Sequence, residues 1–204
     1  MVKNYTDSQL LKRVQELESF RGFPLGYWVL GVRSQNDIVN KFDDKFYIWF
    51  SNGNEEINQK FITVLKGTTN PGYTILKGGF KKYNRLGAAV VKSNIWFYDV
   101  YKYGLHRGKM PALRQRRNKP MLYYRDKNLN GKSEELGEVY NNVIYTNFHG
   151  STYNEKNPVT KDNINRSAGC QVVSENKKYF ELMKKFALAS LNQKYFTYCL
   201  IKEF

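Results

Sequence analysis

The chain has 204 residues, 41% of them hydrophobic and 16% aromatic, so it carries enough apolar material to offset the entropy of ordering its backbone, which excludes a disordered tail. Its 33 Lys and Arg against 18 Asp and Glu give a formal net charge of +15, which predicts attraction to polyanions such as nucleic acid, anionic lipid or acidic cell-wall polymers. Basic residues concentrate over residues 107–119, but no signature of a nucleic-acid module accompanies them, and no linker or repeat divides residues 1–204 into two domains.

The first predicted element is a helix over residues 7–19, within an N-terminal segment of residues 1–22. Thr6 and Gln9 match a capping box, in which the two side chains satisfy each other's backbone N–H groups. Apolar residues follow at helical spacing until Gly22 ends the pattern.

The same N-terminal residues predict no signal peptide. Asp7 and its polar neighbours interrupt the apolar core that such a peptide needs, and no stretch of the chain is apolar enough to span a bilayer. We therefore expect synthesis in the cytoplasm and no membrane span. In that reducing compartment Cys170 and Cys199 are expected to stay free thiols rather than pair.

Short runs of β-branched and aromatic residues fill the middle of the chain, separated by turn signals such as Asn70-Pro71-Gly72 and Asn130-Gly131. They predict strands over residues 28–32, 46–50, 61–65, 73–76, 88–91, 95–100, 121–124 and 143–146. This pattern is typical of a sheet-rich body.

A second helix is predicted over residues 174–192, with Ser174 as its cap and an inward stripe formed by Phe180, Met183, Ala187 and Leu191. Alternating residues over 195–201 then predict a terminal strand, in which Cys199 is a small buried hydrophobe. The elements together predict one mainly β (α+β) domain with flanking helices.

The residues that carry chemistry lie within 143–173. His149 follows an apolar run, and Cys170 ends the segment Arg166-Ser167-Ala168-Gly169-Cys170. A thiol at its ordinary pKa is mostly protonated at neutral pH, so a nucleophilic cysteine needs a base or a cation nearby, and His149 is the nearest candidate in sequence. The small residues before Cys170 would let backbone N–H groups near Gly169 approach a reacting carbonyl as an oxyanion hole.

This arrangement resembles the L,D-transpeptidase (YkuD-like) family, whose signature is a histidine, often followed by glycine, then a loop that ends in Ser/Thr-His-Gly-Cys. The matching residues here are His149-Gly150, a loop over residues 151–166, and Ser167-Ala168-Gly169-Cys170. The family resemblance implies a β-sandwich or barrel with flanking helices. It also implies thiolate attack on the peptide bond at the L-centre of a diamino acid in a peptidoglycan stem peptide, with loss of the terminal D-residue to an amine or to water.

The resemblance assigns roles to particular residues. The catalytic group comprises Cys170, His149, Gly150, Ser167 and Gly169. The predicted substrate-binding group comprises Arg166, Gln171, His106 and Ser151. Val172 stands where the family usually has an Asn or Arg, so the carboxylate-binding role of that arginine is left unassigned. No cofactor is expected, and the expected partners are stem peptides and anionic wall polymers.

A divergent branch associated with phage and prophage genomes is similar in its Ser-Ala-Gly-Cys-Gln-Val motif, in the segment around Gly104-Leu105-His106-Arg107-Gly108 and in two further segments, Ala112-Leu113-Arg114-Gln115 and Arg125-Asp126-Lys127-Asn128. That similarity implies a lysis or virion-borne enzyme that acts at the cell wall. Ala168 stands where the family has its second histidine, which favours one alternative: a catalytically inactive wall-binding or virion structural protein. A nucleic-acid-binding protein is a weaker alternative, and the oligomeric state is left open.

The sequence contains two sets of metal-ligand residue types, and neither is complete. His106, His149 and Cys170 are zinc ligand types, but they lack the paired spacing of a zinc site. Asp126, Asn128, Asn130 and Gly131 match the first half of a calcium loop, but Gly137 occupies the twelfth position, where a bidentate Glu is needed. A polar hairpin turn is the preferred interpretation of this segment.

Overall fold

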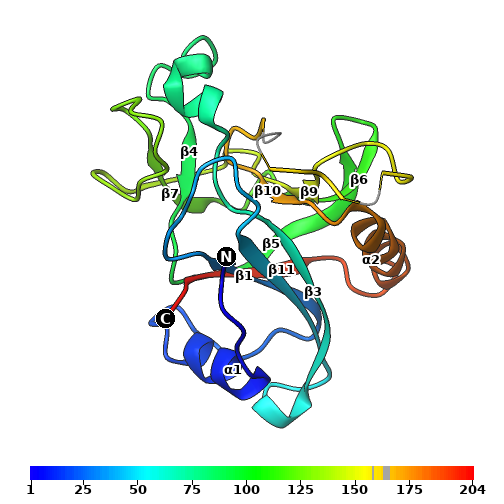
Figure 1. The fold of residues 1–204 in the computed structure, drawn as a ribbon. Helices are drawn as coiled ribbons and strands as arrows, with labels where there is room; N and C mark the ends of the chain where they lie inside the picture. The colour runs from blue at the N-terminus through cyan, green and yellow to red at the C-terminus, as the bar shows by residue number, and fades with distance from the viewer. Residues whose placement is uncertain (158, 163–165) are drawn as a thin grey trace.

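The computed structural model describes residues 1–157, 159–162 and 166–204, and it is mainly β, with 34% strand and 16% helix, as predicted (Figure 1). Eight strands form a closed barrel in the order β1-β11-β5-β6-β9-β10-β3-β2. Their bounds are β1 Gly26–Arg33, β2 Asp44–Ser51, β3 Gln59–Thr68, β5 Ile95–His106, β6 Met110–Gln115, β9 Phe148–Gly150, β10 Gln171–Val173 and β11 Phe196–Lys202. A separate three-stranded sheet holds β4 Ala89–Val91, β7 Met121–Arg125 and β8 Tyr140–Asn142.

Strand β1 lies at the centre of the hydrophobic packing. It pairs in parallel with β11 and antiparallel with β2, so Leu30 lies between Cys199 and Tyr47. Val29 contacts one cluster of buried residues and Trp28 the other, which explains why β1 reads as a continuous apolar run. As predicted, Cys199 is fully buried in the terminal strand.

Helix α1 (Asp7–Gln15) starts where the capping box predicts, with both Thr6 and Gln9 hydrogen bonds present. It ends four residues before the predicted boundary at residue 19. The reason is tertiary: the indole N–H of Trp96 donates to the carbonyl of Val14 and the Trp96 backbone N–H donates to Ser19, so the end of the segment is held against β5.

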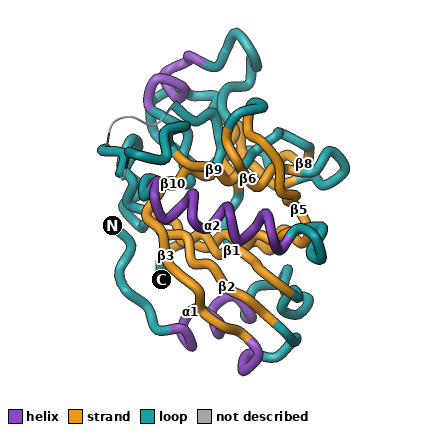
Figure 2. Tube along the Cα trace, turned by 90° about the vertical axis from the view of Figure 1, so that its right-hand side faces the viewer, coloured by secondary structure: helices purple, strands orange, loops and turns teal. Residues whose placement is uncertain are grey.

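Helix α2 (Asn176–Ala189) lies across the barrel strands (Figure 2). The predicted cap is wrong, because the Ser174 hydroxyl donates to the carbonyl of Lys66 in β3, and the helix begins two residues later. Leu191 is 80% exposed, beyond the helix end. Of the predicted inward stripe, Phe180 and Met183 are buried and Ala187 is half-buried, and Tyr179, Leu182 and Phe186 complete the buried face.

Two predicted strands are wrong. Residues 73–76 enter a helical turn, Ile75–Gly79, because the turn at Gly72 offers its carbonyl to the N–H groups of Ile75 and Leu76. Residues 143–146 form an irregular segment, because the side-chain oxygen of Gln115 accepts the N–H groups of Ile144 and Thr146. A strand neighbour would otherwise bind those N–H groups, so the strand begins only at Phe148.

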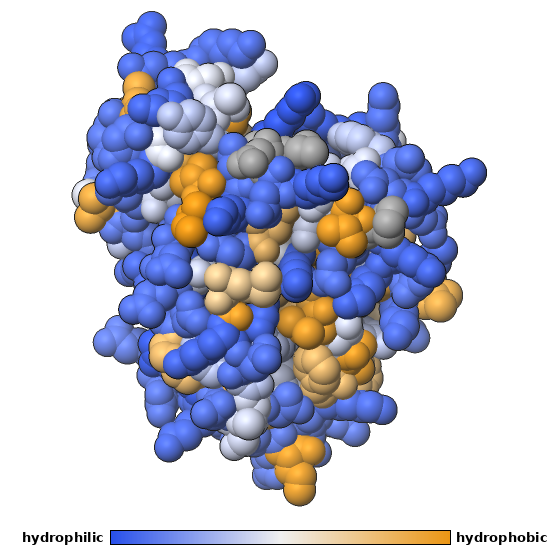
Figure 3. Space-filling model, viewed as in Figure 1, coloured by the Kyte–Doolittle hydropathy of each residue, from blue (hydrophilic) through white to orange (hydrophobic). Residues whose placement is uncertain are grey.

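The face of the molecule in Figure 3 is mostly hydrophilic, with apolar side chains in separate patches. The two ends of the chain pack together, with the Tyr5 and Phe204 rings stacked 4.3 Å apart. Of the helices in the described ranges, none combines the length and the apolar character needed to cross a membrane.

Candidate functional site: a cysteine and two histidines in one cleft

Two short barrel strands bring His149 and Cys170 side by side. His149 is the middle residue of β9, and Cys170 immediately precedes β10. The strands pair in parallel, with His149 opposite Val172, and the N–H of Gln171 donates to the carbonyl of Asn147 at 2.8 Å. The predicted loop over residues 151–166 is the crossover that parallel pairing requires. Residues 158 and 163–165 of that loop lie outside the described part of the chain.

His106, the last residue of β5, completes a three-residue cluster. Its ring stacks on the ring of His149 with centroids 4.1 Å apart and planes 21° from parallel. One ring nitrogen of each histidine and the Sγ atom of Cys170 all lie within 4.8 Å of one another. The structure therefore joins His106, predicted as a substrate-binding residue, to the predicted catalytic pair.

Hydrogen bonds fix which nitrogen of each ring carries the proton. His149 Nδ1 lies 2.7 Å from the carbonyl oxygen of Gly150, which only accepts, so Nδ1 carries the proton and Nε2 keeps its lone pair. His106 Nδ1 lies 3.0 Å from Nδ2 of Asn147, whose Oδ1 accepts the N–H of Gln115. Neutral His106 therefore carries its proton on Nε2.

Asn147 is the site residue that sequence reasoning missed. Its backbone N–H donates to Sγ of Cys170 at 3.4 Å, and its side chain holds His106. It lies two residues before His149, but no motif marks an asparagine whose backbone and side chain contact two different site residues. Its position next to the predicted histidine was the one available signal.

Burial sets the protonation states of the resting site. It raises the pKa of the Cys170 thiol, an effect that the Asn147 N–H only partly offsets. Burial lowers the pKa of His149 to about 3, helped by His106, and the pKa of His106 to about 4, helped by Arg107. At neutral pH the site holds a neutral thiol beside two neutral imidazoles, not the resting thiolate that the sequence argument favoured.

Two glycines are required by close packing around the cluster. A Cβ on Gly150 would lie 2.9 Å from the Tyr179 ring. Gly169 has φ of +133°, and a Cβ there would lie 2.6 Å from the carbonyl oxygen of Ala89. The Gly169 N–H donates to the hydroxyl of Ser167, which in turn donates to the carbonyl of Cys170. These two residues hold the turn that presents the thiol, and an oxyanion role for Gly169 requires its bond to Ser167 to open.

The cluster lies in a cleft of about 750 Å³. Arg166 and Ser151, which the sequence analysis predicts to bind substrate, line this cleft, and Arg107 and Arg114 add two more cations. Gln171 does not line it: the side chain is fully buried, accepts from Tyr198 and donates to the carbonyl of Gly169.

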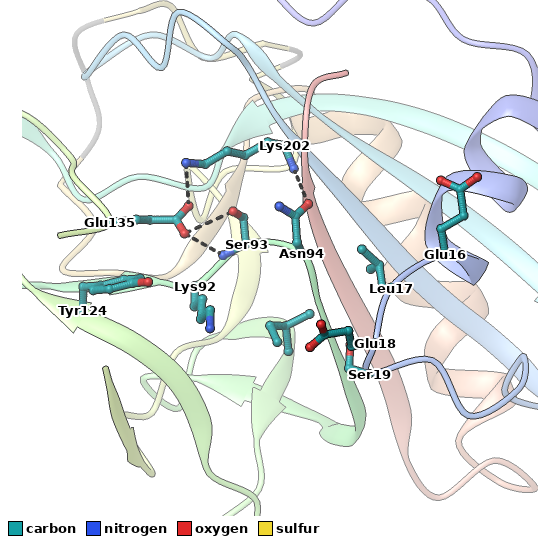
Figure 4. A pocket seen from close by; sticks show the side chains of 11 residues that line it. Glu16, Leu17, Glu18, Ser19, Lys92, Ser93, Asn94, Tyr124, Glu135 and Lys202 are labelled. Carbon is teal, nitrogen blue, oxygen red and sulfur yellow. Dashed lines mark hydrogen bonds and ion pairs between the residues drawn. The ribbon is translucent and has the colours of Figure 1, made fainter. Parts of the chain in front are cut away.

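The cluster is poorly arranged for a metal ion as it stands. The lone pair of an imidazole nitrogen lies in the ring plane, and the planes of His106 and His149 are only 21° apart, so their lone pairs do not converge on one point. A second hollow of about 640 Å³ lies beside Glu135 and Lys202 (Figure 4). Its lining, within the described residues, has no thiol or imidazole, so the Cys170 cleft is the candidate site.

Comparisons with protein-family models, curated proteins and solved structures found no match.

Proposed function

We propose that this chain is a cysteine-dependent acyl-transfer enzyme that acts on peptidoglycan stem peptides with an L,D-transpeptidase-like domain. One observation carries the proposal: the Cys170 thiol and two imidazole nitrogens lie within 4.8 Å of one another in an open cleft. A nucleophile, a base and a group that orients the base are the parts that covalent acyl transfer needs. Here they are Cys170, His149 and the carbonyl of Gly150.

In the proposed reaction, Nε2 of His149 takes the thiol proton as Sγ of Cys170 bonds to the substrate carbonyl carbon, and the carbonyl π pair moves to oxygen. The Nε2–H of His106 donates to that oxygen. When the tetrahedral intermediate collapses, the C–N bond breaks and the imidazolium of His149 returns the proton to the leaving amine. Water or an amine then attacks the thioester, and the thiol is restored.

A neutral resting pair suits this general-base route. Burial lowers the pKa of His149, so its neutral imidazole is a weak base. The proton transfer is therefore driven by carbon–sulfur bond formation rather than by a preformed ion pair. The bond between Nδ1 and the Gly150 carbonyl supports the imidazolium that forms transiently.

The charge of the cleft supports an anionic peptide substrate. Arg107, Arg114 and Arg166 all line it, and a guanidinium binds a carboxylate through two parallel hydrogen bonds. A stem peptide presents a terminal D-residue carboxylate next to the bond that would break. The net charge of +15 also favours approach to an anionic wall.

The direct test is to incubate the purified protein with defined tetrapeptide and pentapeptide muropeptides and follow the products by mass spectrometry. We expect stems shortened by one D-residue if water resolves the thioester, or new cross-links if an amine does. Unchanged muropeptides, together with no acyl adduct on the protein, would overturn the proposal.

A catalytically inactive wall-binding or virion protein is the second candidate, and Ala168, at the position of the family's second histidine, favours it. Such a protein would sediment with isolated cell walls and release no product from them. The muropeptide assay separates it from the enzyme, because binding alone alters no mass.

The pH dependence of thiol alkylation checks the resting protonation state. We expect the rate of iodoacetamide reaction at Cys170 to rise about tenfold for each pH unit up to and beyond its ordinary pKa near 9, because burial raises that pKa. Cys199 is fully buried, with a pKa raised well above the usual range, and should react only after unfolding. Mass analysis of peptides reports each rate, and a rate plateau near neutral pH would show instead that His149 holds a thiolate.

A further inference from the structure

The loop that connects β7 to β8 carries oxygen-bearing side chains at alternate positions. Counting Asp126 as position one, Asn128 is third, Asn130 fifth and Glu134 ninth. These are positions at which calcium loops place ligands, and the loop lies outside the proposed catalytic cleft. Because Gly137 replaces the glutamate at the twelfth position, the sequence alone favours a polar turn for this loop.

One buried oxygen in this loop lacks a partner. Asp126 is only 5% exposed, and within the described residues its Oδ2 atom has no hydrogen-bond donor. Buried carboxylates are normally paired or bound to metal, so an unsatisfied one points to a missing cation.

Glu134 binds the side chains of both asparagines in this loop. The Nδ2 groups of Asn128 and Asn130 both donate to the same oxygen of Glu134, at 2.7 and 2.9 Å. Asp126, Asn128 and Glu134 line one hollow of about 220 Å³, together with Arg125, Lys127 and Glu138, and Asn130 lies outside that lining. The Lys127 ammonium is paired with Glu138. The Oδ1 atoms of Asn128 and Asn130 accept the backbone N–H groups of Asn130 and Lys132, and each keeps a second lone pair that an ion can use once the Nδ2 groups leave Glu134.

The backbone follows the course that such a loop needs. Gly131, at the sixth position, has φ of +83°, the left-handed conformation for which calcium loops use glycine. Leu129, at the fourth position, also has positive φ, at 53°. A leucine rarely adopts that conformation, so the tight winding of the loop is imposed by its other contacts.

We propose that residues 126–134 form a calcium site, with Asp126, Asn128, Asn130 and Glu134 as side-chain ligands. The seventh position, Lys132, contributes its backbone carbonyl as calcium loops do. The second carboxylate comes from Glu134 at the ninth position, because Gly137 at the twelfth position has no side chain that could bind the ion. A set of hard oxygen donors with two carboxylates selects calcium rather than zinc, which favours nitrogen and sulfur.

Hydrogen bonds to the rest of the molecule anchor both ends of the loop. Glu135 follows Glu134 directly and bonds to Ser93 and Lys202 (Figure 4). At the other end, the N–H of Asp126 donates to the carbonyl of Ala88, next to β4. Since both ends are anchored, little ordering entropy opposes binding of the ion.

The test is calcium binding by the full chain after removal of metal with EGTA, measured by competition with a chromophoric chelator. We expect a dissociation constant below about 1 mM, and a Tm that rises with calcium more than with equal magnesium. Asp126→Asn and Glu134→Gln should each weaken binding at least about tenfold. Glu181→Gln removes one exposed carboxylate from α2 and should leave binding unchanged.

Glu134 is partly exposed, so its variant keeps the test valid even if Asp126→Asn fails to fold. No binding at millimolar calcium, equal stabilisation by magnesium, or wild-type affinity in the Glu134→Gln variant would each overturn the proposal. None of these outcomes depends on whether Cys170 is catalytic.

Discussion

Replacement of Cys170 by alanine is expected to lower the rate of muropeptide conversion by at least about 10³-fold and to abolish the acyl adduct. The covalent route needs the sulfur both to attack the carbonyl and to hold the acyl group. The His149 imidazole and the three arginines that line the cleft remain in this variant, so substrate binding should change little. The measurement is initial rate by liquid chromatography and mass spectrometry, with the fold checked by circular dichroism.

Cys199→Ala is the matched control, because it removes the other thiol of the chain from a fully buried position in β11. Loss of one small side chain there should cost about 1 kcal/mol of unfolding free energy and leave the rate near wild type. A Cys170→Ala variant that converts muropeptides as fast as Cys199→Ala would eliminate Cys170 as the nucleophile.

Replacement of Glu135 by alanine is expected to lower the free energy of unfolding by about 3 kcal/mol. Arg33 is 1% exposed, and its guanidinium lies 2.5 Å from a carboxylate oxygen of Glu135. Burial raises the pKa of nearby Asp44 to about 7, so that carboxyl is only partly ionised at neutral pH and replaces Glu135 poorly. Without Glu135, a buried cation loses its main counter-charge. Urea denaturation reports the change.

The adjacent residue offers a control for that measurement. Glu134→Ala removes a partly exposed carboxylate one position away, and in calcium-free buffer it should cost less than about 0.5 kcal/mol. Replacing Arg33 and Glu135 together by Met and Leu should recover most of the lost stability, since a buried ion pair can be replaced by apolar groups of similar volume. If Glu134→Ala and Glu135→Ala destabilise equally, the buried pair is not what stabilises this region.

The fold could be predicted from sequence where local signals and tertiary packing agree. The α1 capping box, the apolar run of β1 and the alternation of β11 are local patterns. Strands β1 and β11 form where they were expected, and α1 starts at the predicted residue but ends at Gln15. Two of the errors lie where a side chain bonds to backbone from a distant part of the chain. The Gln115 side chain accepts the N–H groups of Ile144 and Thr146, and the Lys66 carbonyl accepts the Ser174 hydroxyl.

The candidate site was also predicted only in part from the sequence. His149, Gly150 and Cys170 were found from the sequence because they lie at the ends of one crossover loop, and β9 and β10 close that loop by parallel pairing. His106 reaches them from the end of β5, forty-three residues before His149 in the printed sequence, so spacing could not place its ring against that histidine. Asn147 was missed because its backbone N–H contacts Cys170 and its side chain contacts His106, and neither contact has a motif in the sequence.

Short-range periodicity and a motif of small residues beside a thiol were enough to predict the mainly β class, the two helices and the Cys-His pair. Long-range packing sets the protonation of that pair, the stacking of His106 and the unpaired Oδ2 atom of Asp126. Each of these depends on burial, and burial is set by residues from distant parts of the chain packing around one point.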